Sequence, residues 1–152
     1  MSRPLAGAVA VRVGSVEAPA WAWQALREGR VARLATASAA GAPHLVPVCY
    51  VLAGGELWTP IDAKPKTTRA LRRVRNLAEN PRASLLVDHY EEDWRELRWV
   101  LAHGRAELVR GEAAAPALAR LRAKYPQYLE VEAGPEAIRL VPERIVAWTA
   151  SG

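Results

Sequence analysis

The chain has 152 residues, a length that favours one domain able to bury about 70% of its unfolded surface without disulfides or a structural metal. Its single cysteine excludes an internal disulfide, and no apolar run approaches the roughly 20 residues of a membrane helix. The net charge of +5 favours an anionic partner, which could be a nucleic acid, a membrane or a phosphorylated small molecule.

Residues 1–16 contain arginines and small apolar residues, but they lack a sustained apolar core and a cleavage site. This pattern argues against a signal peptide. We therefore expect a loose N-terminal leader over residues 1–16 and a single domain over residues 17–152. The lone cysteine fits a reducing, cytoplasmic location.

The first half of the domain reads as one helix followed by a meander of antiparallel strands. Pro19 suits the first turn of the helix, and Gly29 suits its end. Strands are predicted over residues 31–37, 43–52 and 56–61.

The second half of the chain alternates helices with strands. Apolar residues recur at helical spacing between Leu71 and Leu77. The corresponding helix is predicted to begin at Thr67 or Thr68 and to end at Asn80. Further strands are predicted over residues 82–88, 96–110 and 137–149, and a short helix over residues 113–124.

Six strands with short turns and two or three peripheral helices indicate an α+β protein built on a six-stranded antiparallel split β-barrel. Barrel closure removes the exposed edges that such apolar strands would otherwise carry. Gly104 is predicted to mark a β-bulge, and Pro142 is predicted to interrupt the last strand.

The clearest chemical signal lies between residues 58 and 69. The chain has 21 basic residues, of which three are lysines, and two of these, Lys64 and Lys66, share one short loop. The predicted helix start follows, where free backbone amides attract anions and Thr67 adds a hydroxyl. Arg69 brings a guanidinium group to the same place. The segment predicts a phosphate site, and the alternative is a solvated loop with an ordinary threonine cap.

Two other features have both a structural and a functional interpretation. Pro47 lies within a predicted strand, where it lacks an amide donor. It marks either an edge strand or bulge, or a gap in the ladder against which a planar ring lies. Trp94 and Trp99 flank a polar loop and serve either core or interface packing, or stacking beside a cofactor across a dimer interface.

The basic and histidine residues elsewhere give weaker signals. Four arginines on the helix ending at Asn80 are interpreted as a solvated face, because no nucleic-acid-binding motif accompanies them. The three histidines have no metal-ligand spacing with one another or with Cys49. We therefore expect neither a nucleic-acid partner nor a metal site.

Three blocks of sequence carry a family resemblance. They are VARLAT with GAPHLVPV (residues 31–36 and 41–48), DAKPK with RNLAENPRASLLVDHY (62–66 and 75–90), and IRLVPERIVAW (138–148). The first resembles the pyridoxamine 5′-phosphate oxidase-like, FMN-binding split-barrel proteins. The other two look like the actinobacterial F420-dependent branch of that superfamily. The resemblance covers roughly residues 20–149.

The resemblance implies a split-barrel homodimer with two cofactors at the dimer interface. It assigns the cofactor phosphate to Lys64, Lys66 and Thr67. It places against the tricyclic ring the backbone of Val46, Pro47, Val48 and Cys49. It lines the ring and ribityl chain with Thr59, Pro60 and Ile61, and it brings from the partner subunit Arg98 and Trp99.

The resemblance also implies the activity. We expect hydride transfer between coenzyme F420 and a small unsaturated or carbonyl-conjugated substrate, with no essential acid–base residue. The alternatives are an FMN-binding oxidase or reductase on the same fold, and a carrier that binds the cofactor without turnover. The chain lacks the arginine-rich closing segment of pyridoxamine phosphate oxidases proper, which argues against that reaction.

Overall fold

The computed structural model of the protein describes residues 9–62, 71–129 and 133–152. Its strands are β1 (Ala10–Val13), β2 (Val16–Pro19), β3 (Ala32–Ala37), β4 (Pro43–Val48), β5 (Val51–Ala53), β6 (Glu56–Asp62), β7 (Arg82–His89), β8 (Arg98–Arg110) and β9 (Ala133–Thr149). Its α-helices are α1 (Ala20–Glu28), α2 (Arg72–Glu79) and α3 (Ala115–Lys124). The α+β class is confirmed. No helix in the described part of the chain is long and apolar enough to cross a membrane.

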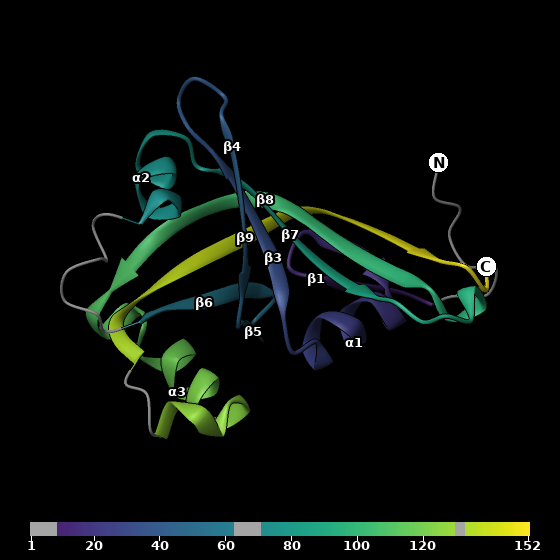
Figure 1. The fold of residues 1–152 in the computed structure, drawn as a ribbon. Helices are drawn as coiled ribbons and strands as arrows, with labels where there is room; N and C mark the ends of the chain where they lie inside the picture. The colour runs from purple at the N-terminus through teal and green to yellow at the C-terminus, as the bar shows by residue number, and fades with distance from the viewer. Residues whose placement is uncertain (1–8, 63–70, 130–132) are drawn as a thin grey trace.

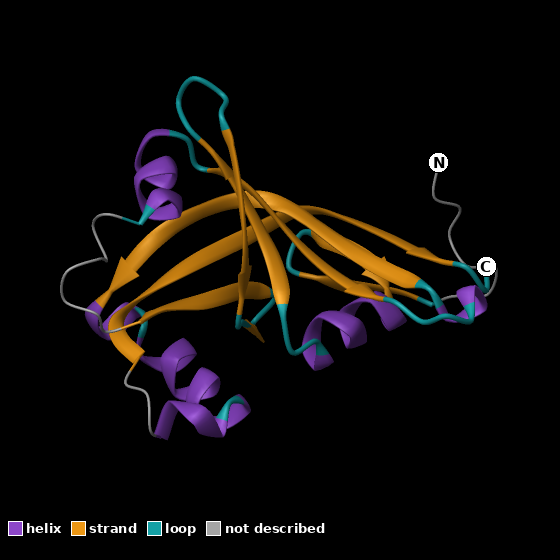
Figure 2. Cartoon of the chain, viewed as in Figure 1, coloured by secondary structure: helices purple, strands orange, loops and turns teal. Residues whose placement is uncertain are grey.

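The described strands form a seven-stranded antiparallel sheet and a separate two-stranded hairpin. The order in the large sheet is β4-β3-β7-β8-β9-β6-β5. Figures 1 and 2 show β8 and β9 running along the length of the molecule. The predicted six-stranded barrel is therefore wrong in its strand count, and the sheet is not a closed barrel. Its two edge strands, β4 and β5, are nevertheless consecutive in the chain, so residues 49–50 hold one end of each edge close together.

The extra strand arises because the predicted strand over residues 43–52 breaks after Val48. Tyr50 turns its side chain into the core, where it is fully buried. Side chains near the end of α3 bind its backbone: Tyr50 N donates to Tyr125 Oη (3.2 Å), and Lys124 Nζ donates to Tyr50 O (2.9 Å). These bonds replace a sheet ladder, so the chain turns a corner without leaving buried polar groups unpaired.

Two hydrophobic clusters hold the helices against the sheet. The larger contains Leu26 of α1, Leu77 of α2 and the inward-facing residues of β3, β7 and β8. The smaller packs Leu118 and Leu121 of α3 against residues of β5, β6 and β9. On α1 the deeply buried indole is Trp23, whose Nε1 donates to Val11 O (2.9 Å).

Local differences from the predicted elements appear at three places. β1 lies within the predicted loose leader and pairs with β2, which packs against β9. The helix predicted from Thr67 or Thr68 begins later, at Arg72, because Leu71 has extended backbone angles. The last strand, predicted over residues 137–149 with an interruption at Pro142, is one strand that runs through Pro142.

A β-bulge explains how Pro142 fits inside β9. The pairing register shifts between His103 and Gly104, as predicted, but the extra residue is on the opposite strand. His103 pairs with Arg144 and Gly104 with Pro142, so Glu143 has no opposite residue. A Cβ atom at Gly104 would collide with the Val141 carbonyl oxygen, so only glycine allows the two strands to approach this closely.

Candidate functional site

The residues predicted to present backbone to a ring lie on a sheet edge. Val46, Pro47 and Val48 belong to β4, which pairs with β3 on one side only. Pro47 is exposed, and Val46 is half-buried against the larger core cluster. An edge strand spares the amide that proline lacks, so the edge-strand interpretation of Pro47 is confirmed. The same edge also offers backbone groups that have no ladder partner.

The residues predicted to line the ring and ribityl chain are buried in this chain. Thr59 and Ile61 are 4% and 1% exposed, and Pro60 is also buried. They lie on β6, where Thr59 pairs with Ile138 of β9. Their side chains therefore belong to the packed interior, and this part of β6 is not open to a ring in the single chain.

The predicted phosphate-binding residues Lys64, Lys66, Thr67 and Arg69 lie outside the described residues. The structure does describe the helix that follows them. α2 begins at Arg72, and its N-terminal cap, Leu71, forms no side-chain hydrogen bond. The predicted cap by Thr67 or Thr68 is therefore wrong. The free backbone amides at the start of α2 lie several residues after Lys64 and Lys66, so they do not add to the argument for a phosphate site at those lysines.

Arg98 and Trp99 face opposite sides of the sheet, because successive strand residues alternate. Val100, which shares the side of Arg98, is fully buried in the larger core cluster. Trp99 lies on the outer side, directly opposite Asp88 of β7 and Trp148 of β9. Both residues therefore cannot contact one cofactor on a single face of the sheet.

The outer side carries a set of apolar residues in register across the central strands. We call it the sheet patch: Leu86, Trp99, Leu101, Val146 and Trp148. All five are half-buried, and none belongs to either hydrophobic cluster. Contiguous apolar surface of this kind marks an interaction site more often than a solvated face.

Arg33 and Asp88 link the β4 edge to this patch. Arg33 lies opposite Pro47 on one side and Leu86 on the other, and its guanidinium is 3.2 Å from the Asp88 carboxylate. Both side chains are about 40% exposed, so the pair adds little stability. No pattern in the sequence indicates this pair, because residues 55 positions apart meet only once the strand register is known.

Beside the β4 edge, polar side chains form what we call the Tyr50 cluster: Arg30, Tyr50, Lys124 and Tyr125. Tyr125 Oη lies 2.9 Å from Arg30 O and 3.1 Å from Tyr50 O. Lys124 Nζ lies 4.1 Å from the centre of the Tyr50 ring, and Arg30 stacks over the Tyr125 ring. Burial, and to a smaller extent Tyr125, raises the pKa of Tyr50. Burial, with the nearby Arg30 charge, lowers the pKa of Lys124 to about 8.

Residues 22–149 match the sequence model of a protein family, which is described as pyridoxamine 5′-phosphate oxidase. This match spans most of the chain. The protein belongs to the pyridoxamine 5′-phosphate oxidase family. The predicted family assignment is thereby confirmed.

One relative and two solved structures are similar to the chain along most of their length. The chain is 33% identical over 128 residues to the 5a,11a-dehydrotetracycline/5a,11a-dehydrooxytetracycline reductase of Streptomyces rimosus, covering 84% of this chain and 80% of that protein. The fold is similar to the conserved hypothetical protein Rv2991 from Mycobacterium tuberculosis, with a TM-score of 0.71, 24% identity and coverage of 98% and 91% of the two chains. It is also similar to the heme storage protein HutZ from Vibrio cholerae, with a TM-score of 0.66, 18% identity and coverage of 84% and 90%.

The family resemblance implies a flavin-type cofactor. Among the described residues, those of β4 fit such a group, and those of β6 do not. The exposed backbone of β4 at Pro47 could receive the polar edge of a planar ring. On the inner side of the same strand, His44 Nδ1 is buried and has no hydrogen-bond partner among the described residues. The buried side chains of Thr59 and Ile61 do not offer a contact surface. Among the described residues, β4 alone would therefore contact the cofactor. Its other contacts would come from residues outside the described ranges or from a partner subunit.

Proposed function

We propose that the protein is an oxidoreductase that uses the deazaflavin F420 to transfer a hydride to or from a small unsaturated or carbonyl-conjugated compound. One observation supports the reductase activity: the 33% identity, over 84% of the chain, to a protein named as a reductase of dehydrotetracyclines. The choice of F420 rests on the resemblance of residues 62–66, 75–90 and 138–148 to the F420-dependent branch. A dehydro compound carries a carbon–carbon double bond that the reductase saturates. A related chain on the same fold is expected to act on an acceptor of the same general kind.

The protein's own residues would bind and orient the cofactor, while the cofactor supplies the hydride chemistry when it is bound. Lys64, Lys66 and Thr67, with Arg69, would hold its phosphate. The backbone of Val46, Pro47, Val48 and Cys49 would lie against its ring. The Tyr50 cluster holds the chain immediately after Cys49, so it would keep the backbone of β4 in place as the ring binds.

The proposed active form is a homodimer whose subunits meet through the sheet patch. Trp99 of the partner subunit would then cover the ring that β4 holds, and closure of the interface would exclude water from it. The half-buried tryptophans and aliphatic residues of the patch support this arrangement. A ring bound at the edge of one chain would otherwise be open to solvent on one face.

A titration with two cofactors tests the proposal. Binding of F420 and of FMN to the purified protein is followed by the change in each cofactor's fluorescence. Tight, stoichiometric binding of F420 with weak binding of FMN is expected, and the loaded protein should oxidise reduced F420 when a conjugated enone is added. The reverse preference would make the protein an FMN-binding oxidase or reductase, which family membership alone also allows. Binding without turnover across many acceptors would indicate a carrier.

The double variant Lys64→Ala/Lys66→Ala tests the phosphate site. Loss of two ammonium groups should weaken F420 binding by at least about tenfold, since each charge-assisted contact to an anion contributes roughly 1.5–3 kcal/mol. Arg120→Ala/Arg122→Ala removes the same charge from the exposed face of α3 and should leave affinity unchanged. Wild-type affinity in the lysine variant would show that the phosphate binds elsewhere.

A further inference from the structure

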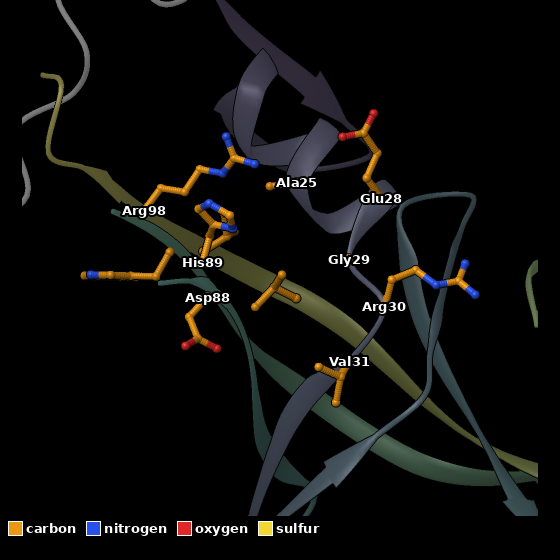
Figure 3. A pocket seen from close by; sticks show the side chains of 11 residues that line it. Ala25, Glu28, Gly29, Arg30, Val31, Asp88, His89 and Arg98 are labelled. Atoms are coloured by element: carbon orange, nitrogen blue, oxygen red, sulfur yellow. The ribbon is translucent and has the colours of Figure 1, made fainter. Parts of the chain in front are cut away.

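A pocket of about 350 Å³ lies between the C-terminal half of α1 and the adjoining ends of β7 and β8 (Figure 3). Its floor is apolar: Val87 and Val100 are 8% and 0% exposed, and Ala25 is half-buried. The volume corresponds to about a dozen water molecules at roughly 30 Å³ each. A small molecule fits this space.

Arg98 and His89 stand side by side over this floor. They are directly opposite in the β7–β8 ladder, so their Cβ atoms lie roughly 5 Å apart. Each is two positions from a core valine on its own strand, which places both side chains on the side of α1. Figure 3 shows them next to each other, facing Ala25 of α1. Two nitrogen-rich side chains in this arrangement offer several N–H donors to one ligand.

The other charged side chains around the pocket already have partners. Asp88 points to the opposite side of the sheet, where it pairs with Arg33 (3.2 Å). Glu28 accepts a hydrogen bond from the Gln24 amide. Arg30 donates to Lys124 O (3.1 Å) and stacks on Tyr125. In Figure 3 the charged ends of Asp88 and Arg30 point away from Arg98.

Arg98 is different from these neighbours. Its guanidinium has no carboxylate within 4 Å and no side-chain hydrogen bond among the described residues. His89 is engaged at Nε2 alone, by Glu91 at 3.4 Å. The pocket therefore combines a dry apolar floor with a forked cation whose hydrogen-bonding capacity is unused by the described chain.

We infer that this pocket is a second binding site, one that takes a small monocarboxylate with a compact apolar body. The planar fork of Arg98 matches a carboxylate in a bidentate arrangement. The apolar body of the ligand packs over Ala25 and Val87, whose remaining exposed surface it covers. Gly29 keeps the pocket wall close, because a Cβ atom there would collide with Tyr50 Oη and Val87.

This site is independent of the proposed cofactor site. It opens on the α1 side of the sheet, whereas the sheet patch and the proposed subunit contact lie on the other side. Trp99 borders both sites, but its side chain lies on the side of the sheet patch. Arg98, which the family resemblance assigned to the cofactor with Trp99, has no part in the proposed function. A failure to bind F420 would leave this inference untouched.

Nuclear magnetic resonance titration of the ¹⁵N-labelled full chain with benzoate tests the inference. Saturable shifts are expected at the amides of residues 25–31, 87–89 and 98–100. Benzamide has the same shape without the charge and should bind at least about tenfold more weakly. Arg98→Gln should lose at least tenfold in benzoate affinity, while Arg95→Gln, whose side chain is 87% exposed outside the pocket, should bind as the wild type does.

Arg98→Lys separates the fork from the charge, and it serves as the test if Arg98→Gln fails to fold. It should bind benzoate more weakly than the wild type and more tightly than Arg98→Gln. The inference would be overturned by no saturable shift at the pocket amides, by equal affinity for benzamide, or by equal affinity in the Arg98 variants. Displacement of benzoate by millimolar chloride or phosphate would also overturn it, because it would show a general anion site without the apolar selectivity.

Discussion

Lys124 holds an ammonium group against two aromatic rings, at a place where burial opposes its charge. Its Nζ donates to Tyr50 O and lies 5.3 Å from the centre of the Tyr125 ring. Attraction to the rings and the carbonyl does not fully offset the lost hydration, and Arg30 adds repulsion, so the pKa falls to about 8. The groups facing this amine are Arg30, Cys49, Tyr50 and Tyr125.

The lowered pKa of Lys124 predicts that stability rises with pH above about 8. In the unfolded chain this amine keeps its proton up to about pH 10.5, so between these values the unfolded state binds more protons than the folded state. The free energy of unfolding should therefore increase by about 1 kcal/mol between pH 8 and pH 10, a figure reduced from the full linkage because the amine is half-exposed. Above pH 10 the raised pKa values of Tyr50 and Tyr125 act in the opposite direction.

Urea denaturation at several pH values measures this effect. Lys124→Met keeps the length of the side chain and removes the titrating group, so its stability should stay flat between pH 8 and pH 10. Arg122→Met on the exposed side of the same helix should follow the wild type. An equal rise in Lys124→Met would assign the effect to other groups.

At the scale of elements, alternation of apolar residues located most of the strands, and helical spacing with terminal proline and glycine signals located the three described α-helices. β3, β6 and β7 begin and end within one or two residues of their predicted limits. The break after Val48 was not visible, because the apolar pattern continues through Cys49 and Tyr50. The partners that stabilise the break, Lys124 and Tyr125, lie about 75 positions away in the sequence.

The candidate site was predicted less completely than the strands. Pro47 indicated an edge strand, because proline is excluded from central strands. The sequence could not show that Arg98 and Trp99 face opposite sides, since that depends on which side of β8 meets α1. Nor could it show that Leu71 adopts an extended backbone and delays the start of α2, as its helical spacing favours the opposite.

The bulge between β8 and β9 makes Gly104 a sensitive position. A side chain there meets the backbone of Val141 and Pro142, at 2.8 Å from Val141 C and 3.0 Å from Pro142 Cα. Backbone atoms cannot move aside as a flexible side chain does, so Gly104→Ala should lower the free energy of unfolding by about 3 kcal/mol. Urea denaturation at 25 °C measures the change.

Gly41→Ala is the matched control for this glycine. Gly41 has a φ of +86° in the β3–β4 turn, and a Cβ atom there meets nothing within 4 Å. Its substitution introduces backbone strain alone, at about 1 kcal/mol. Equal losses in the two variants would show that strand approach at Gly104 is looser than the structure indicates.

On the scale of the whole molecule, the sheet patch decides whether the chain acts alone. Leu101 lies at its centre, opposite Leu86 on one strand and Val146 on the next. In a monomer this half-buried side chain would border solvent, and Leu101→Asp would be tolerated at modest cost. In the proposed dimer the same change places a carboxylate in an apolar contact, where an unpaired charge is strongly unfavourable.

We therefore predict that the wild-type chain sediments at twice its monomer mass of 16.6 kDa, and that Leu101→Asp sediments at the monomer mass. Val11→Asp, on the terminal hairpin away from the patch, should leave the mass of the wild type unchanged. The monomeric variant should also bind F420 more weakly, because it no longer receives Trp99 of the partner subunit over the ring. A monomeric wild type would remove the sheet patch from the proposed site, and the cofactor would then have to be held by one chain alone. A dimer that survives Leu101→Asp would instead place the subunit contact on another face.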